Sequence, residues 1–208
     1  MKEWTIGKKV MLKLVSAQFR YVEELKGKKW YHTWAEWLID SKFRRTKRLD
    51  KFLSDQLDNP GEKVIALAKK LKRKNPDSTI ISILTYVRRN IIYKYDKDNF
   101  GKLEYWAEAK ETLKKRSDDC DGLNGLIYIL ARLAGIPYFM IYSVVGLTVT
   151  EGHYWCVYYS TKEDKLVAID ATYDVTLASL SARKPFVLGP KYAKISYLFN
   201  DKHIFKVK

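Results

Sequence analysis

The clearest hydrophobic pattern in the chain lies just after Cys120. Apolar residues recur there at the three- and four-residue spacing of one face of an α-helix, and Gly135 and Pro137 then stop the pattern. Because Cys120 precedes the first apolar position by one turn, the pattern puts it at the helix start, on the side that faces the protein. The apolar positions of this predicted helix are Leu123, Leu126, Ile127, Leu130, Leu133 and Ala134.

Three runs of strand-forming residues follow this helix. They span residues 137–146, 153–160 and 165–170, and the turn residues 161–164 join the last two as a hairpin. The tail, residues 195–207, has the pattern of another hairpin around Asn200 and Asp201. The sequence therefore predicts an α+β fold in which the helix packs on an antiparallel sheet.

Additional helices are predicted before Cys120. The break at 59–61, Asn-Pro-Gly, is the best candidate boundary, and helical patterns follow it and again follow residues 75–77. The second pattern runs into an extended stretch at 91–96. Before the boundary, Trp30, Trp34 and Trp37 recur at helical spacing, which favours core packing over an aromatic platform for bases or sugars.

Composition supports a compact globule, since 47% of the residues are hydrophobic and 14% are aromatic. The net charge of +15 suggests an acidic partner or nucleic acid, but the charge is spread along the chain. Residues 1–58 hold a net charge of +6 and the remainder +9. Solvated helix faces are the favoured interpretation, and a nucleic-acid or acidic partner is the disfavoured alternative.

The cellular compartment is predicted from the cysteines and the N-terminus. Cys120 and Cys156 are the two cysteines, and they form neither a CxxC pair nor a disulfide framework, which favours a reducing compartment. Lysines interrupt the apolar residues near the N-terminus, and no run reaches membrane-spanning length. We expect a cytoplasmic protein without a membrane partner, although export by another route gives the same pattern.

The position of Cys120 suggests nucleophilic chemistry. A helix N-terminus stabilises a thiolate, and Asp119 is placed to cap the helix. Neighbouring aspartates oppose ionisation, so the thiol needs an imidazolium partner. His153 opens the second strand, and Asp170 ends the next strand, where its carboxylate is placed to orient the histidine ring. Each residue alone has a structural explanation, but the three together fit one triad.

Other uses of these residues are less favoured. Strand alternation puts Cys156 on the face opposite His153, so we interpret it as a small buried residue. The same alternation separates Cys120, Cys156 and His153 as zinc ligands, and no paired-ligand spacing is present. We therefore expect no metal and no cofactor.

The segments 117–146, 151–159 and 166–174 resemble the transglutaminase-like superfamily of cysteine enzymes, including its bacterial cysteine proteinases. The resemblance spans roughly residues 80–175. It implies a papain-like core with a triad of Cys120, His153 and Asp170. The resemblance implies a catalytic domain over residues 59–208. Residues 1–58 form an accessory segment of mixed, basic character, either separate or part of the same domain. The family often has glycine where this chain has Asp118, which affects the approach of the substrate.

An acyl-transfer reaction also needs an oxyanion hole, and the backbone N–H of Cys120 is a natural first donor. The resemblance offers Trp106 as a second donor, while packing as a core aromatic is an equal alternative. We expect a peptidase or amidase that acts on a peptide or protein through a thioester. A protein-glutamine transglutaminase or deamidase is one alternative, and a non-catalytic binding module with a basic surface is another. The sequence leaves the oligomeric state open.

Overall fold

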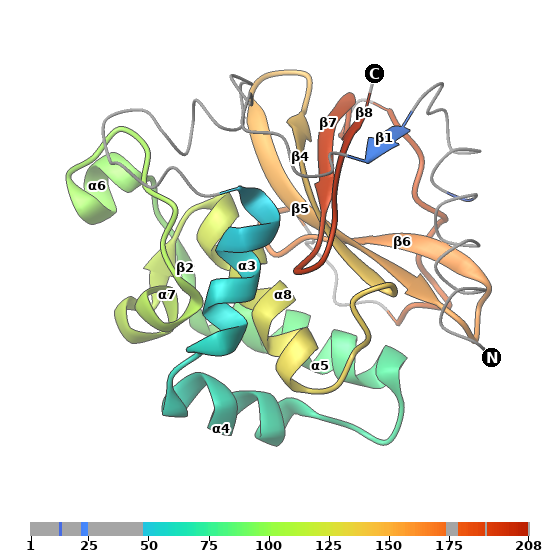
Figure 1. The fold of residues 1–208 in the computed structure, drawn as a ribbon, viewed down its shortest axis with the longest axis horizontal. Coiled ribbons are helices and arrows are strands. Elements are labelled where there is room, and N and C mark those ends of the chain that lie inside the picture. Colours follow the sequence, from blue (N-terminus) through green and yellow to red (C-terminus); the bar gives the residue numbers. More distant parts are fainter. Residues whose placement is uncertain (1–12, 14–21, 25–47, 174–178, 190, 208) are drawn as a thin grey trace.

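The computed structural model describes Lys13, Val22–Glu24 and residues 48–173, 179–189 and 191–207. Its main feature is a six-stranded sheet, in which the order is β1-β8-β7-β4-β5-β6 and neighbouring strands run antiparallel (Figure 1). The strands are β1 (Val22–Glu24), β4 (Ile141–Leu147), β5 (Gly152–Ser160), β6 (Lys165–Ile169), β7 (Lys194–Phe199) and β8 (Ile204–Val207).

Helices gather on one side of this sheet, with α8 between the others and the strands (Figure 1). They are α3 (Leu49–Asp58), α4 (Glu62–Leu71), α5 (Pro76–Asn90), α6 (Asp96–Phe100), α7 (Ala109–Lys115) and α8 (Cys120–Leu133). The short strands β2 (Ile92–Tyr93) and β3 (Ser117–Asp118) pair in parallel and lead into α8. The fold is thus the α+β arrangement that the sequence predicts.

The helix α8 is the centre of the core because nearly all of its surface is covered. Its residues from Asp121 to Ala131, except Gly125, are buried. The apolar face predicted from the sequence packs on β4 and β5, and the other helices cover the remaining faces. A helix that is buried all round holds its first residue in a fixed place relative to the sheet.

The start of α8 is shaped by two adjacent aspartates. Asp119 caps the helix, as predicted, by accepting a hydrogen bond from the N–H of Asp121 at 3.2 Å. Asp118, which stands where the family often has glycine, is fully buried and accepts a hydrogen bond from the Thr112 hydroxyl at 2.6 Å. Its carboxyl group fills the space beside Gly122, where a Cβ would lie 2.0 Å from the Asp118 Cγ. Glycine at 122 therefore makes room for the aspartate.

The secondary structure agrees with the sequence pattern around the helix and both hairpins. Gly135 ends α8 with a φ of +96°, and residues 161–164 and 200–203 form the two turns. The tryptophan stripe at 30–37 lies outside the described residues. The boundary near residue 59 stays a prediction, although α3, from before it, contributes Phe52 and Leu53 to the same core as α8.

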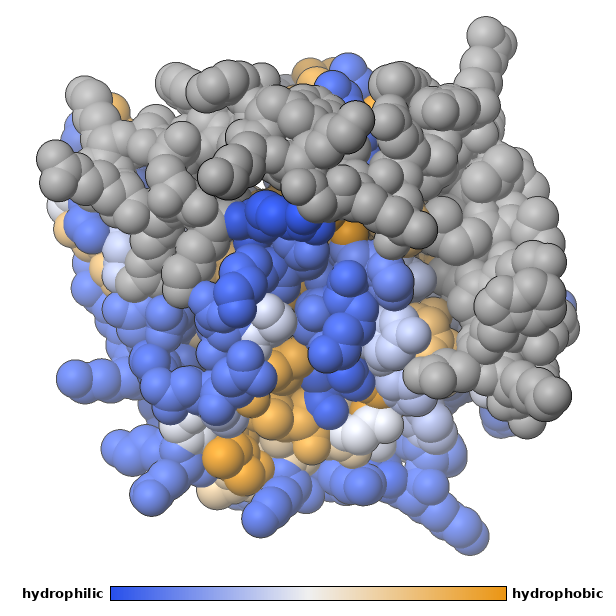
Figure 2. Space-filling view, viewed as in Figure 1, coloured by the Kyte–Doolittle hydropathy of each residue, from blue (hydrophilic) through white to orange (hydrophobic). Residues whose placement is uncertain are grey.

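Hydrophilic side chains cover much of the visible described surface, with a smaller apolar area in the lower half of the view (Figure 2). None of the described helices has the length and apolar character needed to cross a membrane.

Candidate active site

Cys120 is the first residue of α8 and is partly buried. The thiol lies beside the beginning of β5, because the backbone of Tyr154 forms a hydrogen bond with it. Burial and then the charge of Asp119 raise the pKa of the Cys120 thiol well above its usual value. A backbone hydrogen bond from Tyr154 to the thiol opposes this rise only in part. Of the neighbouring aspartates expected from the sequence to oppose ionisation, Asp119 therefore does so.

His153 lies at the second position of β5, and Asp170 follows the last residue of β6. The His153 Nε2 lies 2.9 Å from the Asp170 Oδ2, and both side chains are buried. Burial alone would raise the pKa of Asp170, but the hydrogen bond and charge of His153 hold that pKa below its usual value. The structure thus joins the two residues in the relation that orients a catalytic imidazole.

Several further groups donate hydrogen bonds to the Asp170 carboxylate. The Tyr192 hydroxyl donates to Oδ2 at 2.9 Å, and the Thr172 N–H donates to Oδ1 at 2.9 Å. The Asn124 amide donates to Oδ1 at 3.3 Å. These partners come from separate segments, so Asp170 is held from several directions. Sequence reasoning missed Tyr192 and Asn124, because neither has a motif or spacing that links it to the triad.

A cleft of 460 Å³ brings Cys120 and His153 together. Its remaining wall includes aromatic residues and carboxylates, among them Tyr95, Trp106 and Glu104. A larger hollow of 650 Å³ between α5 and residues 179–181 contains none of the three triad candidates. The smaller cleft is therefore the place where a substrate can meet the thiol and the imidazole.

Trp106 lines this cleft but is 93% buried and packs edge-on against Tyr154. Its indole Nε1 donates a hydrogen bond to the Glu104 Oε1 at 3.0 Å. Burial and then the charge of Asp119 raise the pKa of Glu104 to about 7. The indole N–H is thus bonded to a carboxylate in this structure, and a role as oxyanion donor requires it to change partners.

Cys156 is fully buried on β5, and its thiol donates to the backbone oxygen of Asn124 at 3.4 Å. Burial raises the pKa of this thiol. These contacts agree with the interpretation of Cys156 as a small core residue.

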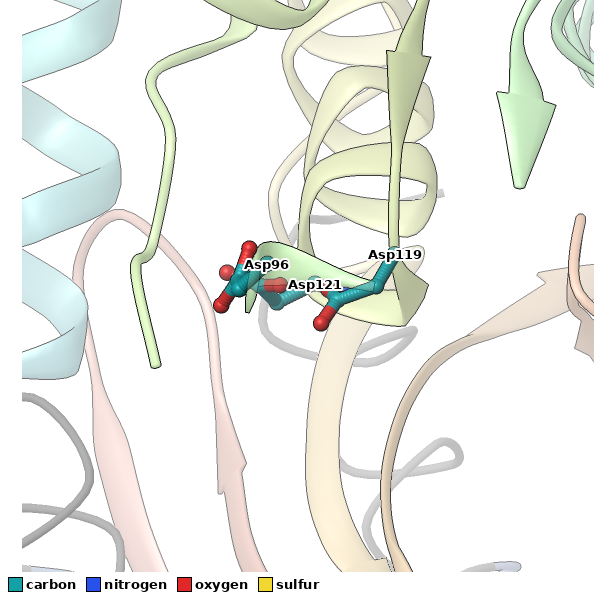
Figure 3. Close-up of side chains that lie close together, drawn as sticks. All are labelled: Asp96, Asp119 and Asp121. Carbon is teal, nitrogen blue, oxygen red and sulfur yellow. The ribbon is translucent and has the colours of Figure 1, made fainter. Parts of the chain in front are cut away.

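Carboxylates gather at the start of α8 in a way that the sequence did not predict. Asp96, Asp119 and Asp121 each place one oxygen within 4.8 Å of the other two (Figure 3). Burial has the largest effect on both buried carboxyl groups. The pKa of Asp96 is raised to about 8, and the pKa of Asp121 is raised well above its usual value. Among the described residues, this cluster is the group whose side-chain oxygens can hold a metal ion.

Comparisons with known proteins bear on the family and the fold. A family model described as a transglutaminase-like domain matches residues 62–154, which include Cys120 and His153. A calcium-bound structure of LapG from Legionella pneumophila is similar with a TM-score of 0.52 and 19% identity, over 68% of this chain and 74% of that chain. Another LapG structure gives a TM-score of 0.52 and 17% identity over 76% and 87%. No curated protein matches the sequence.

A buried helix that begins with cysteine and packs on an antiparallel sheet defines the class of fold found in cysteine enzymes of the papain-like kind. The family match over residues 62–154 and the shared fold support an assignment to the transglutaminase-like superfamily. This assignment supports a cysteine-type enzyme in general and does not specify the reaction or the substrate.

Proposed function

We propose that the protein is a cysteine hydrolase that cleaves a peptide or amide bond, with Cys120 as nucleophile, His153 as acid and base, and Asp170 as the orienting group. The observation that carries the proposal is the buried hydrogen bond between His153 and Asp170 at the wall of a cleft that also holds Cys120. A purely structural role would not require Cys120 and His153 to line a common cleft.

The reaction follows in two balanced steps. The Cys120 thiol transfers its proton to His153 and its sulfur adds to the substrate carbonyl; the carbon–nitrogen bond breaks, and His153 protonates the leaving amine. Water then attacks the thioester and gives a proton to His153, the carbon–sulfur bond breaks, and the thiol is regenerated. The backbone N–H of Cys120 is the first candidate donor to the oxyanion.

The test combines trapping of the acyl-enzyme with product analysis. The protein is incubated with a mixture of peptides and a primary amine, and mass spectrometry locates any acyl group and identifies the products. We expect an acyl group on Cys120 and a free carboxylic acid as the main product. His153→Ala should reduce turnover by about 10²–10⁴-fold, the usual contribution of general acid–base catalysis. Cys156→Ser is the matched control and should retain activity.

Other results would favour the alternatives. Amide products formed with the added amine would indicate a transglutaminase, and loss of ammonia from glutamine would indicate a deamidase. No acylation, together with iodoacetamide labelling of Cys120 that His153→Ala leaves unchanged, would contradict the enzyme. Binding of a polyanion that weakens steeply with salt would then favour the basic binding module.

A further inference from the structure

Large apolar side chains are exposed in the cleft that holds Cys120. Tyr93, Tyr95 and Leu103 line this cleft and are 38%, 56% and 78% exposed. The other exposed large apolar residues in the described part of the chain are Ile92, Leu147, Val149 and Val187. Exposed apolar residues that gather in one place mark a site of interaction, whereas single scattered ones do not. The three cleft residues therefore indicate a binding surface.

Tyr93 lies next to the candidate nucleophile. The parallel pairing of β2 with β3 holds Tyr93 opposite Asp118, two residues before Cys120. Burial, and after it the charge of Cys120, raises the pKa of the Tyr93 hydroxyl, so the two side chains are within electrostatic reach. The Tyr95 ring meets the Tyr93 ring edge-on, with the ring centroids 5.3 Å apart. Because Tyr95 is the more exposed of the two, the rings form a wall that runs from the nucleophile toward solvent.

The shape and the remaining lining of the cleft suit an apolar group. The buried side chains of Trp106 and Val145 also line it. Its volume of 460 Å³ falls within the range of about 300–1,000 Å³ for ligand sites, which are lined mainly by apolar and aromatic groups. An apolar side chain that enters the cleft can therefore leave water by contact with Tyr93, Tyr95 and Leu103.

The position and charge of this surface identify its occupant as a substrate peptide. The apolar side chains share one cleft with Cys120 and His153, so a ligand that they hold lies against the candidate reacting groups. Two exposed carboxylates, Asp98 and Glu151, line the same cleft. Their negative charge disfavours a polyanion such as a nucleic acid, despite the basic character of the whole chain.

We propose that Tyr93, Tyr95 and Leu103 form a subsite for a large apolar side chain of the substrate. The preferred substrate is then a peptide that has an aromatic or long aliphatic residue close to the cleaved bond. This inference rests on the proposed hydrolase, because it names the substrate class of the same cleft. A single methylene group in a hydrophobic pocket changes kcat/KM by about 10–200-fold, so the preference should be easy to measure.

The experiment compares peptides that differ at one position. The probes are decapeptide mixtures of glycine, serine, alanine, glutamine and lysine, in which each position in turn is fixed as phenylalanine, leucine, alanine or serine. The whole wild-type chain is incubated with them, and mass spectrometry locates the cleaved bonds and gives relative kcat/KM values by competition. We expect phenylalanine and leucine to exceed alanine by at least about tenfold at a fixed distance from the cleaved bond.

Variants of the exposed side chains identify the subsite. Tyr95→Ser and Leu103→Ser should each lower the ratio of kcat/KM for phenylalanine over alanine peptides by about 3–10-fold, because contact buries only part of each side chain. Tyr95→Phe keeps the ring and should retain the ratio. Val187→Ser is the matched control, since Val187 is 60% exposed but does not line the cleft, and the ratio should not change.

Peptide binding by Cys120→Ala separates this inference from the proposed reaction. This variant cannot form a thioester, and mass spectrometry identifies the peptides that it retains from the same mixtures when it is immobilised. We expect it to retain phenylalanine and leucine peptides over alanine peptides, and we expect Tyr95→Ser in the same chain to remove this selection. Such selection without any cleavage by the wild type would support the subsite and contradict the hydrolase.

Three results would overturn the subsite. Cleavage that does not favour large apolar residues would do so and leave the hydrolase standing. So would a preference that Tyr95→Ser and Leu103→Ser leave unchanged. The third is a dimer in sedimentation analysis that these two substitutions convert to a monomer, because a second copy of the chain would then occupy the exposed surface.

Discussion

Removing the Asn124 side chain should destabilise the protein and disturb the candidate triad. Asn124 is fully buried on α8. Its amide nitrogen donates to the Tyr154 carbonyl at 2.8 Å and to the Cys120 carbonyl at 3.0 Å, and its oxygen accepts from the Ala171 N–H at 2.8 Å. One side chain therefore joins the helix that carries the thiol to both strands that carry the other two candidates.

The size of the effect follows from these contacts. Asn124→Ala leaves the Tyr154 carbonyl and the Ala171 N–H without this partner inside the core. Each unsatisfied buried group costs about 1–3 kcal/mol, so we expect a loss of about 2–6 kcal/mol in the free energy of unfolding. Asn90→Ala is the matched control, since Asn90 is partly exposed and donates one bond to Tyr86, and it should cost at most about 1 kcal/mol.

Asn124→Asp tests the same contacts at nearly constant shape. The new carboxylate would face the carbonyls of Tyr154 and Cys120 and the Asp170 carboxylate, so its ionised form is disfavoured and its pKa in the folded protein is raised. The folded state then binds more protons than the unfolded state, and the stability of this variant relative to the wild type should fall as pH rises.

Urea denaturation measures both changes, and iodoacetamide labelling of Cys120 reports the effect on the site. We expect slower labelling in each variant. A loss below about 1 kcal/mol for Asn124→Ala, together with a deficit in Asn124→Asp that does not vary with pH, would refute the reasoning.

Two further predictions concern the frame of the site. Gly122→Ala should cost about 1–3 kcal/mol by urea denaturation, because its Cβ would overlap Asp118, while Gly125→Ala, with open space, should gain about 0.5–1 kcal/mol. Burial by itself would raise the pKa of Asp201, but the hydrogen bond and charge of Arg132 outweigh burial and lower this pKa. The stability that the carboxylate contributes is therefore present above about pH 4 and is lost as the pH falls further. Asp201→Asn should therefore lose stability near neutral pH and approach the wild type in acid; a constant difference would contradict this.

The spacing of apolar and turn residues along the chain predicted individual helices and hairpins. The helix after Cys120 follows from its apolar spacing, its Asp119 cap and its Gly135 stop, and two hairpins follow from alternation and turn residues. Local pattern does not predict the order of the strands in the sheet, where β7 lies between β8 and β4. Pairing between strands so far apart in the chain depends on packing in three dimensions, which no local period encodes.

The carboxylate cluster shows the same limit within the site. Sequence reasoning considered metal sites through histidine and cysteine spacing and predicted none. The sequence predicts that Asp119 and Asp121 disfavour ionisation of the Cys120 thiol. No sequence pattern indicates that Asp96 lies near them. Their approach depends on the short β2–β3 pairing, in which Ile92 lies opposite Ser117 and sets α6 beside the start of α8.

The site also depends on residues beyond the family match. That match ends at residue 154, before Asp170, and the Tyr192 hydroxyl that bonds to the Asp170 carboxylate lies later still. The bulge between Val145 and Gly146 brings β7 close to β4, and a Cβ at Gly146 would lie 2.0 Å from the Lys194 carbonyl. Because Gly146 also pairs with His153, this close approach ties the C-terminal hairpin to the candidate base. The last strands are thus part of the frame that holds the candidate triad.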